Sequence, residues 1–221
     1  MKSRTYQVTL TGESPLLLHR DNIQWGEAMK RWSSDPNNKK HSVAGDDRTP
    51  AHRWIGCLYV NAGTLVIDSD NLMTVLREGG AKCPAGKGNK TFKRETQSGI
   101  VVNEIGWPII VNGGTIPFVA IEKLQTETDF EVHCQTATSL GFNLFVKRAR
   151  VNQTKHVRVR PRFDAWAVSG TLTVLDDTIT TEVLQRILTH AGAYAGLGDW
   201  RPSSPKSPGP FGRFTAVLKE I

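Results

Sequence analysis

Long hydrophobic runs are missing from this chain of 221 residues, and its three cysteines are widely spaced. The longest apolar stretches, such as "LYV" and "TLVI", fall far short of the roughly 20 residues that a membrane-spanning helix needs. The N-terminal segment "MKSRTYQVTL" contains no apolar run typical of a signal peptide. Cys57, Cys83 and Cys134 form no C-x-x-C pair, so neither a zinc site nor a disulfide framework is indicated. These absences favour a cytoplasmic protein that uses no membrane, metal or other cofactor.

Motifs of catalysis are also missing. The chain has no G-x-S-x-G, Walker A or H-E-x-x-H motif, and its six histidines are scattered. His133 and Cys134 lie in a segment predicted to be a strand, where neighbouring side chains point to opposite faces and do not share one ion. His190, which lies near Tyr194 and Arg201 in the sequence, leaves metal-independent RNA cleavage as an alternative. We therefore expect a protein that is not an enzyme.

Positive charge is concentrated in one predicted hairpin. The formal net charge is +7 and the isoelectric point is about 9.5, which favours a polyanionic partner. Residues 147–162, "KRARVNQTKHVRVRPR", hold seven cations and no acid. These cations repel one another unless a polyanion, or acidic residues from elsewhere in the chain, relieves the repulsion. Arginine grips phosphate oxygens in a bidentate manner, so the segment predicts nucleic-acid binding, with a solvated surface hairpin as the alternative.

The register of this hairpin decides which arginines act together. Arg148 and Arg150 share one face of the first strand, while Arg158, Arg160 and Arg162 share one face of the second. Pairing between residues of equal parity places all five on one face, and the other register splits them. The sequence leaves both arrangements open.

Two polar insertions interrupt the regular pattern. Residues 82–98 carry five cations before their single acid, Glu95, and we expect either a disordered loop or an arm that folds over bound nucleic acid. Residues 33–53 carry almost no large apolar side chain and are expected to form a mobile loop. Because its charges are of both signs, the second insertion is the weaker candidate for an interface.

Two helices are predicted with clear boundaries. One is expected to begin near Asp70, with Asp68 or Ser69 as its N-cap, and to end at the Gly79-Gly80 pair. The other is expected to follow an N-cap at Thr178 or Thr180, and its apolar residues recur with helical spacing. A shorter helix is expected around residues 21–33.

The remaining pattern is mostly β and indicates the fold. Strands are predicted at residues 4–11, in short pieces over 100–134, three times within 144–175, and at the C-terminal end. Two helices separated by strands, with a strand at each end, favour an α+β fold with a ferredoxin-like antiparallel sheet. We expect one domain, 1–221, with insertions at about 20–53 and 82–98 and the basic hairpin at about 144–163.

The segment richest in glycine and proline is "GLGDWRPSSPKSPGPFGRF", residues 196–214. It lies between a predicted helix and the last strand, so we expect its ends to be fixed. Its four glycines are expected to end the helix, to enter the strand and to let the backbone come close to a ligand. Arg201, Lys206 and Arg213 would then surround this backbone with charge suited to phosphates, although a purely structural connection is the alternative.

Residues 164–218 resemble the RAMP superfamily (repeat-associated mysterious proteins), and most of all the backbone subunits of CRISPR effector complexes. The shared features are a strand, a helix ending in "AGAYAGLG", then "WRP", and a glycine-bearing turn "GPFGRF" into the last strand. The segment "VIDSDNLMTVLREGGAK" resembles the first helix of the family. The resemblance implies an RRM-like core with inserted thumb and finger segments, in which subunits polymerise along a guide RNA and hold its backbone. By position, the basic hairpin would be thumb-like.

Together these features predict a non-catalytic protein that binds single-stranded RNA, or DNA, and tracks its phosphate backbone. The resemblance further implies self-association along the strand or assembly with other effector-complex subunits. The alternatives are a metal-independent ribonuclease of the same superfamily, and a stand-alone or phage-borne relative that mimics a subunit and docks on an effector complex as an inhibitor. The candidate binding residues are Lys87, Lys90, Lys93, Arg94, Lys147, Arg148, Arg150, Lys155, Arg158, Arg160, Arg162, Gly198, Arg201, Lys206 and Arg213.

Overall fold

The computed structural model describes residues 3–86, 88–151 and 154–221, and the chain divides into two compact units. Unit 1 consists of Met1–Leu17, Val66–Thr115 and Ala165–Ile221, and unit 2 consists of Leu18–Leu65 and Ile116–Asp164. Helices and antiparallel strands occur in both units, which confirms the expected α+β class. Insertion 82–98 lies in unit 1, whereas insertion 20–53 and the basic hairpin lie in unit 2. Within the described residues, no helix has the length and apolar character needed to cross a membrane.

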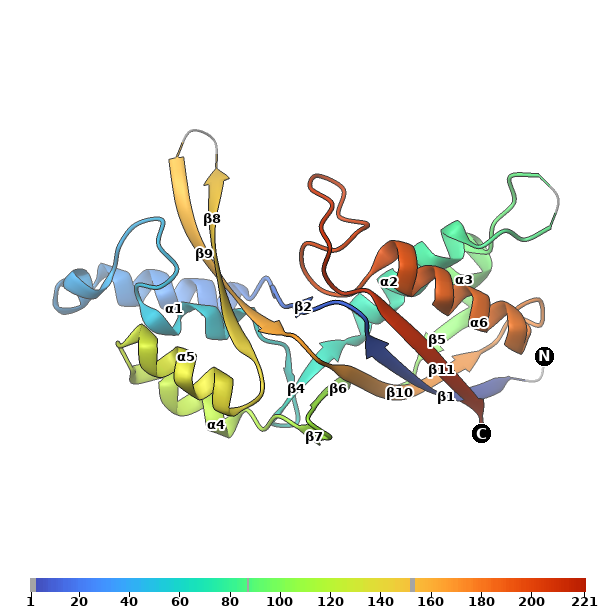
Figure 1. The fold of residues 1–221 in the computed structure, drawn as a ribbon, viewed down its shortest axis with the longest axis horizontal. Helices are drawn as coiled ribbons and strands as arrows, with labels where there is room; N and C mark the ends of the chain where they lie inside the picture. The colour runs from blue at the N-terminus through green and yellow to red at the C-terminus, as the bar shows by residue number, and fades with distance from the viewer. Residues whose placement is uncertain (1–2, 87, 152–153) are drawn as a thin grey trace. The chain divides into compact units, whose positions relative to one another are not determined.

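Unit 1 is built on an antiparallel sheet (Figure 1). Alternation of buried and half-buried residues along its central strands places Tyr6, Val8 and Leu10 on the face covered by helices. The hydroxyl of Tyr6 lies 2.9 Å from that of Thr181, where the second predicted helix begins. The strands in spatial order are β11 (Phe214–Glu220), β1 (Arg4–Gly12), β10 (Ala167–Val174), β6 (Gly106–Val111) and the last three residues of β4 (Thr64–Asp68), with β5 (Ile100–Val102) also paired to β10 and β7 (Gly114–Thr115) to β6.

The two helices with clear boundaries form where the sequence predicts them. Helix α2 (Ser69–Lys82) is capped by the Asp68 side chain, and α6 (Thr181–His190) is capped by Thr180. They lie side by side over the sheet, with the short helix α3 (Lys93–Gly99) beside α2 (Figure 1). Buried leucine, isoleucine and valine side chains on α2 and α6 supply the core between helices and sheet.

The Gly79-Gly80 pair does not end α2, contrary to the prediction. Both glycines lie inside the helix and are buried. A Cβ at Gly79 would lie 2.6 Å from the Cβ of Ala191, and a Cβ at Gly80 would lie 2.3 Å from the hydroxyl of Thr96. The pair is therefore needed for close packing of α2 against its two neighbours, and this need outweighs the low helix propensity of glycine.

Unit 2 surrounds the basic hairpin with short helices (Figure 1). Its hydrophobic centre contains the aromatic residues Trp54, Phe142 and Phe163, and the rings of Phe142 and Phe163 are stacked with centroids 5.1 Å apart. The hairpin strands extend past helices α1 and α5 in Figure 1. The elements are α1 (Ile23–Ser34), the 3₁₀ segments η1 (Pro36–His41), η2 (Ala51–Cys57) and η3 (Lys123–Thr126), β3 (Val60–Asn61), α4 (Val119–Glu122), α5 (Phe130–Ser139), β8 (Asn143–Val151) and β9 (Thr154–Phe163).

Two local predictions in unit 2 are wrong. The segment "DFEVHC" was expected to be a strand, but Phe130–Ser139 is helix α5, whose N-cap Asp129 accepts a hydrogen bond from the backbone of Glu131. His133 and Ala137, one helical turn apart, are its buried residues. The insertion 33–53 was expected to form a mobile loop, but it contains η1 and the start of η2, and most of η2 is buried.

Candidate nucleic-acid interface

The register of the hairpin separates its arginines into two groups. Arg148 pairs with Val157 and Arg150 with Lys155, while Lys147 pairs with Arg158. Directly paired residues project to the same face of a two-stranded ribbon. One face therefore carries Arg148, Arg150 and Lys155, and the opposite face carries Lys147, Arg158, Arg160 and Arg162.

The three arginines of β9 have acidic partners within unit 2. Asp47 is the central one, and its side chain is 6% exposed. Arg158 donates a hydrogen bond to Asp47 Oδ1 at 3.0 Å, and Arg160 approaches Asp47 Oδ2 at 3.5 Å. Arg162 pairs with Asp164 at 2.9 Å. Acidic residues from elsewhere in the chain thus relieve part of the repulsion that the sequence indicates.

A docked segment of insertion 33–53 positions Asp47. The backbone of Val157 donates to the carbonyl of Gly45 at 2.8 Å, and the backbone of Asp47 donates to the carbonyl of Val157 at 2.9 Å. Gly45 has a φ of +79°, and its Cβ would lie 2.8 Å from the ring of His156. Residues 45–47 therefore run along β9 and hold the Asp47 carboxylate against the arginines. The sequence did not reveal this role, because nothing local to Asp47 points to β9.

Positive charge exceeds negative charge around Asp47. A third guanidinium, that of Arg53, has its Nη1 atom 3.9 Å from Asp47 Oδ1, too far for a good hydrogen bond. Three guanidinium groups thus gather around the one carboxylate of Asp47. Among the described residues, no hydrogen bond to the Arg53 side chain is found, and its Nε atom is buried without a partner. Arg53 is thus the cation of this cluster with the most unused hydrogen-bonding capacity.

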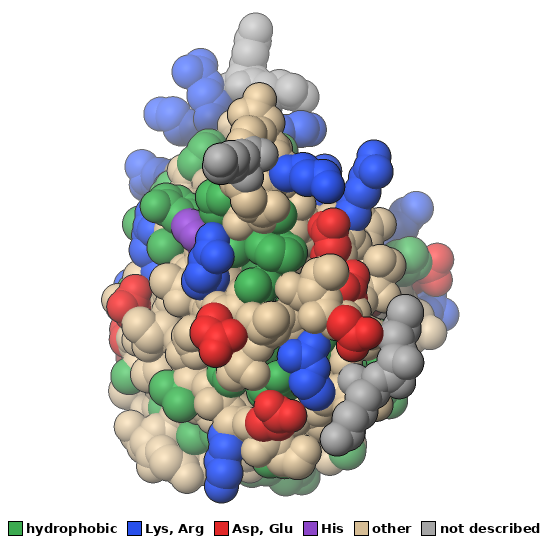
Figure 2. All heavy atoms as spheres, turned by 90° about the vertical axis from the view of Figure 1, so that its right-hand side faces the viewer, with side chains coloured by type: hydrophobic (Ala, Val, Ile, Leu, Met, Phe, Trp, Pro, Cys, Tyr) green, Lys and Arg blue, Asp and Glu red, His purple; other side chains and the backbone are tan. Residues whose placement is uncertain are grey.

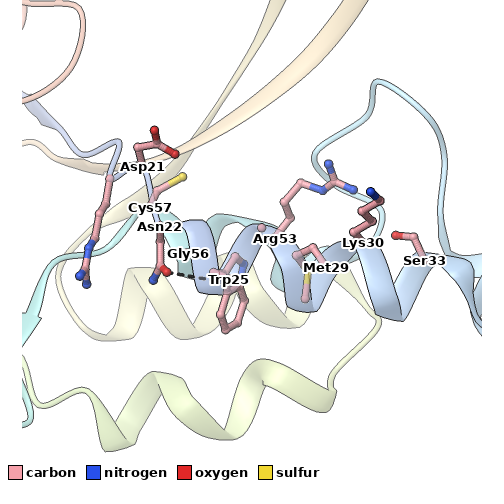
Figure 3. A pocket seen from close by; sticks show the side chains of 11 residues that line it. Asp21, Asn22, Trp25, Met29, Lys30, Ser33, Arg53, Gly56 and Cys57 are labelled. Atoms are coloured by element: carbon pink, nitrogen blue, oxygen red, sulfur yellow. Dashed lines mark hydrogen bonds between the residues drawn. The ribbon is translucent and has the colours of Figure 1, made fainter.

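Arg53 lies between two adjoining hollows on unit 2. One, of about 390 Å³, is lined by His19, Asp47, Arg53, Arg158 and Arg160. The other, of about 340 Å³, lies along α1 and adds Arg20, Trp25 and Lys30 to Arg53. Figure 3 shows the side chains of Lys30 and Arg53 extending to one side of α1, while Trp25 and Met29 extend to the other. We call these two hollows together the basic groove.

The second face of the hairpin is exposed at its cations, although Val159 on the same face is buried. Arg148, Arg150 and Lys155 are exposed, and their neighbours on this face, Val146 and Val157, are apolar. Arg148 and Arg150 make no ion pair with any described acidic residue. Among the described residues, these three cations are therefore the part of the hairpin most accessible to a long polyanion.

The cations of insertion 82–98 belong to unit 1. Lys87 lies outside the described residues. Lys90 is exposed, and Lys93 and Arg94 form the exposed first turn of α3. Over the surface of unit 1 that it presents, Figure 2 shows Lys and Arg side chains interspersed with Asp and Glu. Mixed signs at this surface make it a weaker candidate for binding phosphates.

The candidate residues Arg201, Arg213 and Gly198 of the C-terminal loop make their described contacts within unit 1. Arg201 pairs with Glu78 at 3.3 Å, and Arg213 donates a hydrogen bond to the carbonyl of Ala193. Lys206 is exposed. Gly198 has a φ of +76°, and its Cβ would lie 2.2 Å from the carbonyl oxygen of Leu17 in β2 (Leu16–Leu17). The close approach allowed by this glycine is therefore to the chain's own backbone.

The face of the unit 1 sheet opposite its helices carries hydroxyl and amide side chains. Gln7 donates to the hydroxyl of Ser169 at 2.9 Å, and the hydroxyls of Thr9 and Ser169 also lie 2.9 Å apart. The outward residues of β1 and β10 in the described chain, from Thr5 to Thr11 and from Ala167 to Thr173, include no aromatic side chain. Stacking of bases on aromatic rings, as on an RRM sheet, is therefore not available on these two strands.

Comparison with known proteins adds no assignment. No protein-family model matches the chain, and no curated protein matches its sequence.

Two histidines of unit 2, His52 and His133, are buried in its core. Trp54 donates to Nδ1 of His133 at 3.0 Å, and His52 packs edge-on against Trp25 and Trp32. Burial, with smaller effects of His133 and Arg53, lowers the pKa of His52 from 6.5 to about 4. Burial also lowers the pKa of His133. Among the described residues, no group of three or more His, Cys, Asp or Glu side chains is placed to hold a metal ion.

Burial of neutral His52 predicts a loss of stability in mild acid. Between its unfolded pKa of 6.5 and its folded value of about 4, the unfolded chain binds a proton that the folded chain does not. The free energy of unfolding should therefore fall as the pH drops through this window, by up to about 1 kcal/mol per pH unit. Thermal unfolding of the wild type and His52→Gln from pH 7 to pH 4 measures the effect. The variant should show the flatter profile, and equal slopes would assign the acid sensitivity to other groups.

Proposed function

We propose that this protein binds single-stranded nucleic acid, RNA in the first instance, by its phosphate backbone and without cleaving it. The observation that carries the proposal is the basic groove of unit 2, where Arg53, Arg158 and Arg160 surround a single buried carboxylate. Cations gathered in a hollow attract an anion more strongly than the same cations spread over a flat surface. Phosphate is the anion that guanidinium groups match best in geometry.

Asp47 supports this function by holding arginines before the ligand arrives. A guanidinium has five donors, and Arg158 uses one of them on Asp47. A side chain fixed in this way loses less conformational entropy when its other donors contact phosphate. An acid within a basic site is therefore compatible with anion binding, provided that cations outnumber it as they do here.

The exposed face of the hairpin would extend the contact along a strand. Arg148, Arg150 and Lys155 alternate with other residues on two adjacent strands and give a row of cations without a described acid. Contacts of this kind with the phosphate backbone give affinity without sequence preference. This affinity falls steeply as the salt concentration rises, because binding releases counterions from the nucleic acid.

We also propose a ferredoxin-like assignment for unit 1 and a distant relationship with the RAMP superfamily. The strand order β11-β1-β10-β5, with α2 and α6 as the two crossover helices, supports the first. Self-association along the strand stays a prediction. It is supported by β11, which lies at the edge of the unit 1 sheet and exposes 71% of Val217.

Fluorescence anisotropy with a labelled 20-nucleotide RNA, its DNA equivalent and a duplex, at several salt concentrations, tests the proposal. Arg148→Glu with Arg150→Glu should weaken binding of the single strand about tenfold and lower the salt slope by about two. The same change in net charge, made at Lys123→Glu with Lys219→Glu, should have a much smaller effect because these exposed residues lie off the hairpin.

Two results would count against this function. Absence of binding to any of the three nucleic acids would reject it, and equal losses in both double variants would reject the hairpin as the contact. The mass of the complex, measured by light scattering in the same samples, tests self-association, and the length of the recovered RNA tests cleavage.

A further inference from the structure

Gly26 is a helix-interior glycine that packing does not explain. It is the fourth residue of α1, and apart from its two chain neighbours and the backbone of the helix no described heavy atom comes within 4 Å of the position of its Cβ. Glycine lowers helix stability relative to alanine, so a glycine inside a helix normally has a steric reason. Gly56, Gly79 and Gly80 show such a reason, since a Cβ at each would lie less than 3 Å from a neighbouring atom.

The open space at Gly26 belongs to the hollow of about 340 Å³ along α1. Trp25 and Met29 give this hollow an apolar wall, and its charged lining consists of the cations Arg20, Lys30 and Arg53 and the acid Asp21. A volume of this size is at the small end of ligand sites, which suits a group of one or two rings. The missing side chain of Gly26 lets such a group reach the helix backbone itself.

The wall of this hollow is held rigidly from behind. The indole of Trp25 lies against Gly56, whose Cβ would come 2.1 Å from the indole Cδ1. The edge of His52 packs against Trp25 with ring centroids 6.3 Å apart, and the side chain of Asn22 caps α1 by accepting from the backbone of Trp25 at 3.0 Å. A preorganised aromatic wall binds a flat ring at low entropic cost.

We propose that the hollow at Gly26 holds one unstacked nucleobase of the bound strand, with a flanking phosphate on Arg53. This inference rests on the proposed function and adds to it a contact with a base. Aromatic walls and guanidinium planes receive bases of single strands in general. Arg53 also lines the neighbouring hollow beside Asp47, so a strand that places a base at Gly26 would continue with its phosphates toward Arg158.

The test compares a 12-nucleotide RNA with an abasic ribose-phosphate oligomer of the same length. The wild type should bind the RNA about tenfold more tightly than the abasic oligomer. Gly26→Leu, which fills the hollow with a good helix former, should lower the RNA affinity to that of the abasic oligomer and leave the latter unchanged. Gly114→Leu is the matched control, because Gly114 also has no atom within 4 Å of its Cβ position and lies in β7 of unit 1.

The outcomes separate this inference from the proposed function. Equal wild-type affinity for both oligomers, or an unchanged RNA affinity in Gly26→Leu, would overturn the base site while backbone binding stands. No binding of either oligomer would overturn both. The unfolding temperature of Gly26→Leu should equal or exceed that of the wild type, since leucine favours the helix.

Discussion

Replacing Asp47 with asparagine is expected to lower the free energy of unfolding by about 3 kcal/mol. The asparagine keeps the size of the side chain but removes the negative charge that Arg53, Arg158 and Arg160 surround. The side chain of Asp47 is only 6% exposed, so its hydrogen bonds are shielded from water. The three cations keep some solvent contact, and this places the expected loss at the lower end of the range for a broken buried ion pair.

Urea denaturation followed by tryptophan fluorescence measures this change, with Asp46→Asn as the control. Asp46 is the adjacent residue and pairs with Arg48 at 2.7 Å, in a salt bridge whose arginine is 48% exposed. The side-chain hydrogen bond from Arg48 is the main cause that lowers the pKa of Asp46. Such surface pairs contribute about 0–1 kcal/mol, so the control should unfold nearly as the wild type does. Similar losses in both variants would show that Asp47 has no special role in holding the arginines.

The same cluster explains why reversal of Arg158 and Arg160 is a poor test of binding. From the sequence, these two arginines are natural targets, because the segment around them contains no acid. In the folded chain, glutamates at both positions would face the buried Asp47 carboxylate and destabilise unit 2. Arg148 and Arg150, on the exposed face, are the residues whose reversal reports on binding alone.

Local signals predict those parts of the fold that depend on neighbours in sequence. Asp68 and Thr180 cap their helices as expected, because a cap acts within one turn. Helix α5 is missed because the apolar residues of "DFEVHC" alternate as in a strand, and its N-cap Asp129 is the one local sign of a helix. The burial of His133 beside Trp54, which fixes this helix in unit 2, involves a partner far away in the sequence.

The candidate site depends on contacts that local patterns do not contain. The sequence identifies the cations of the hairpin, but the register that separates Arg148 from Arg158 is a property of the strand pair. Arg53 and Asp47 lie in an insertion of mixed charge, and Asp47 reaches β9 through backbone pairing of residues 45–47 with Val157. A helix-interior glycine such as Gly26 is visible in the sequence, although its meaning depends on whether packing surrounds it.

Gly198→Ala is expected to destabilise the protein by at least about 3 kcal/mol, through two effects that can be separated. The φ of +76° is a conformation that costs a residue with a side chain about 1 kcal/mol. In addition, the new Cβ would lie 2.2 Å from the carbonyl oxygen of Leu17, which is fixed because it accepts a hydrogen bond from the backbone of Asp199 at 2.8 Å. Relief of this overlap requires the loop 196–214 to move away from β2.

Gly113→Ala isolates the first effect, because Gly113 lies in the same unit, has a φ of +79° and has no atom within 4 Å of its Cβ position. It should lose only about 1 kcal/mol in the same urea titration, from the left-handed backbone alone. The difference between the two variants then measures the close approach of the C-terminal loop to Leu17. Equal losses in the free energy of unfolding would mean that the loop moves away from Leu17 at no energetic cost. The glycine would then serve the turn alone, and the ends of the loop would not be fixed as the packing indicates.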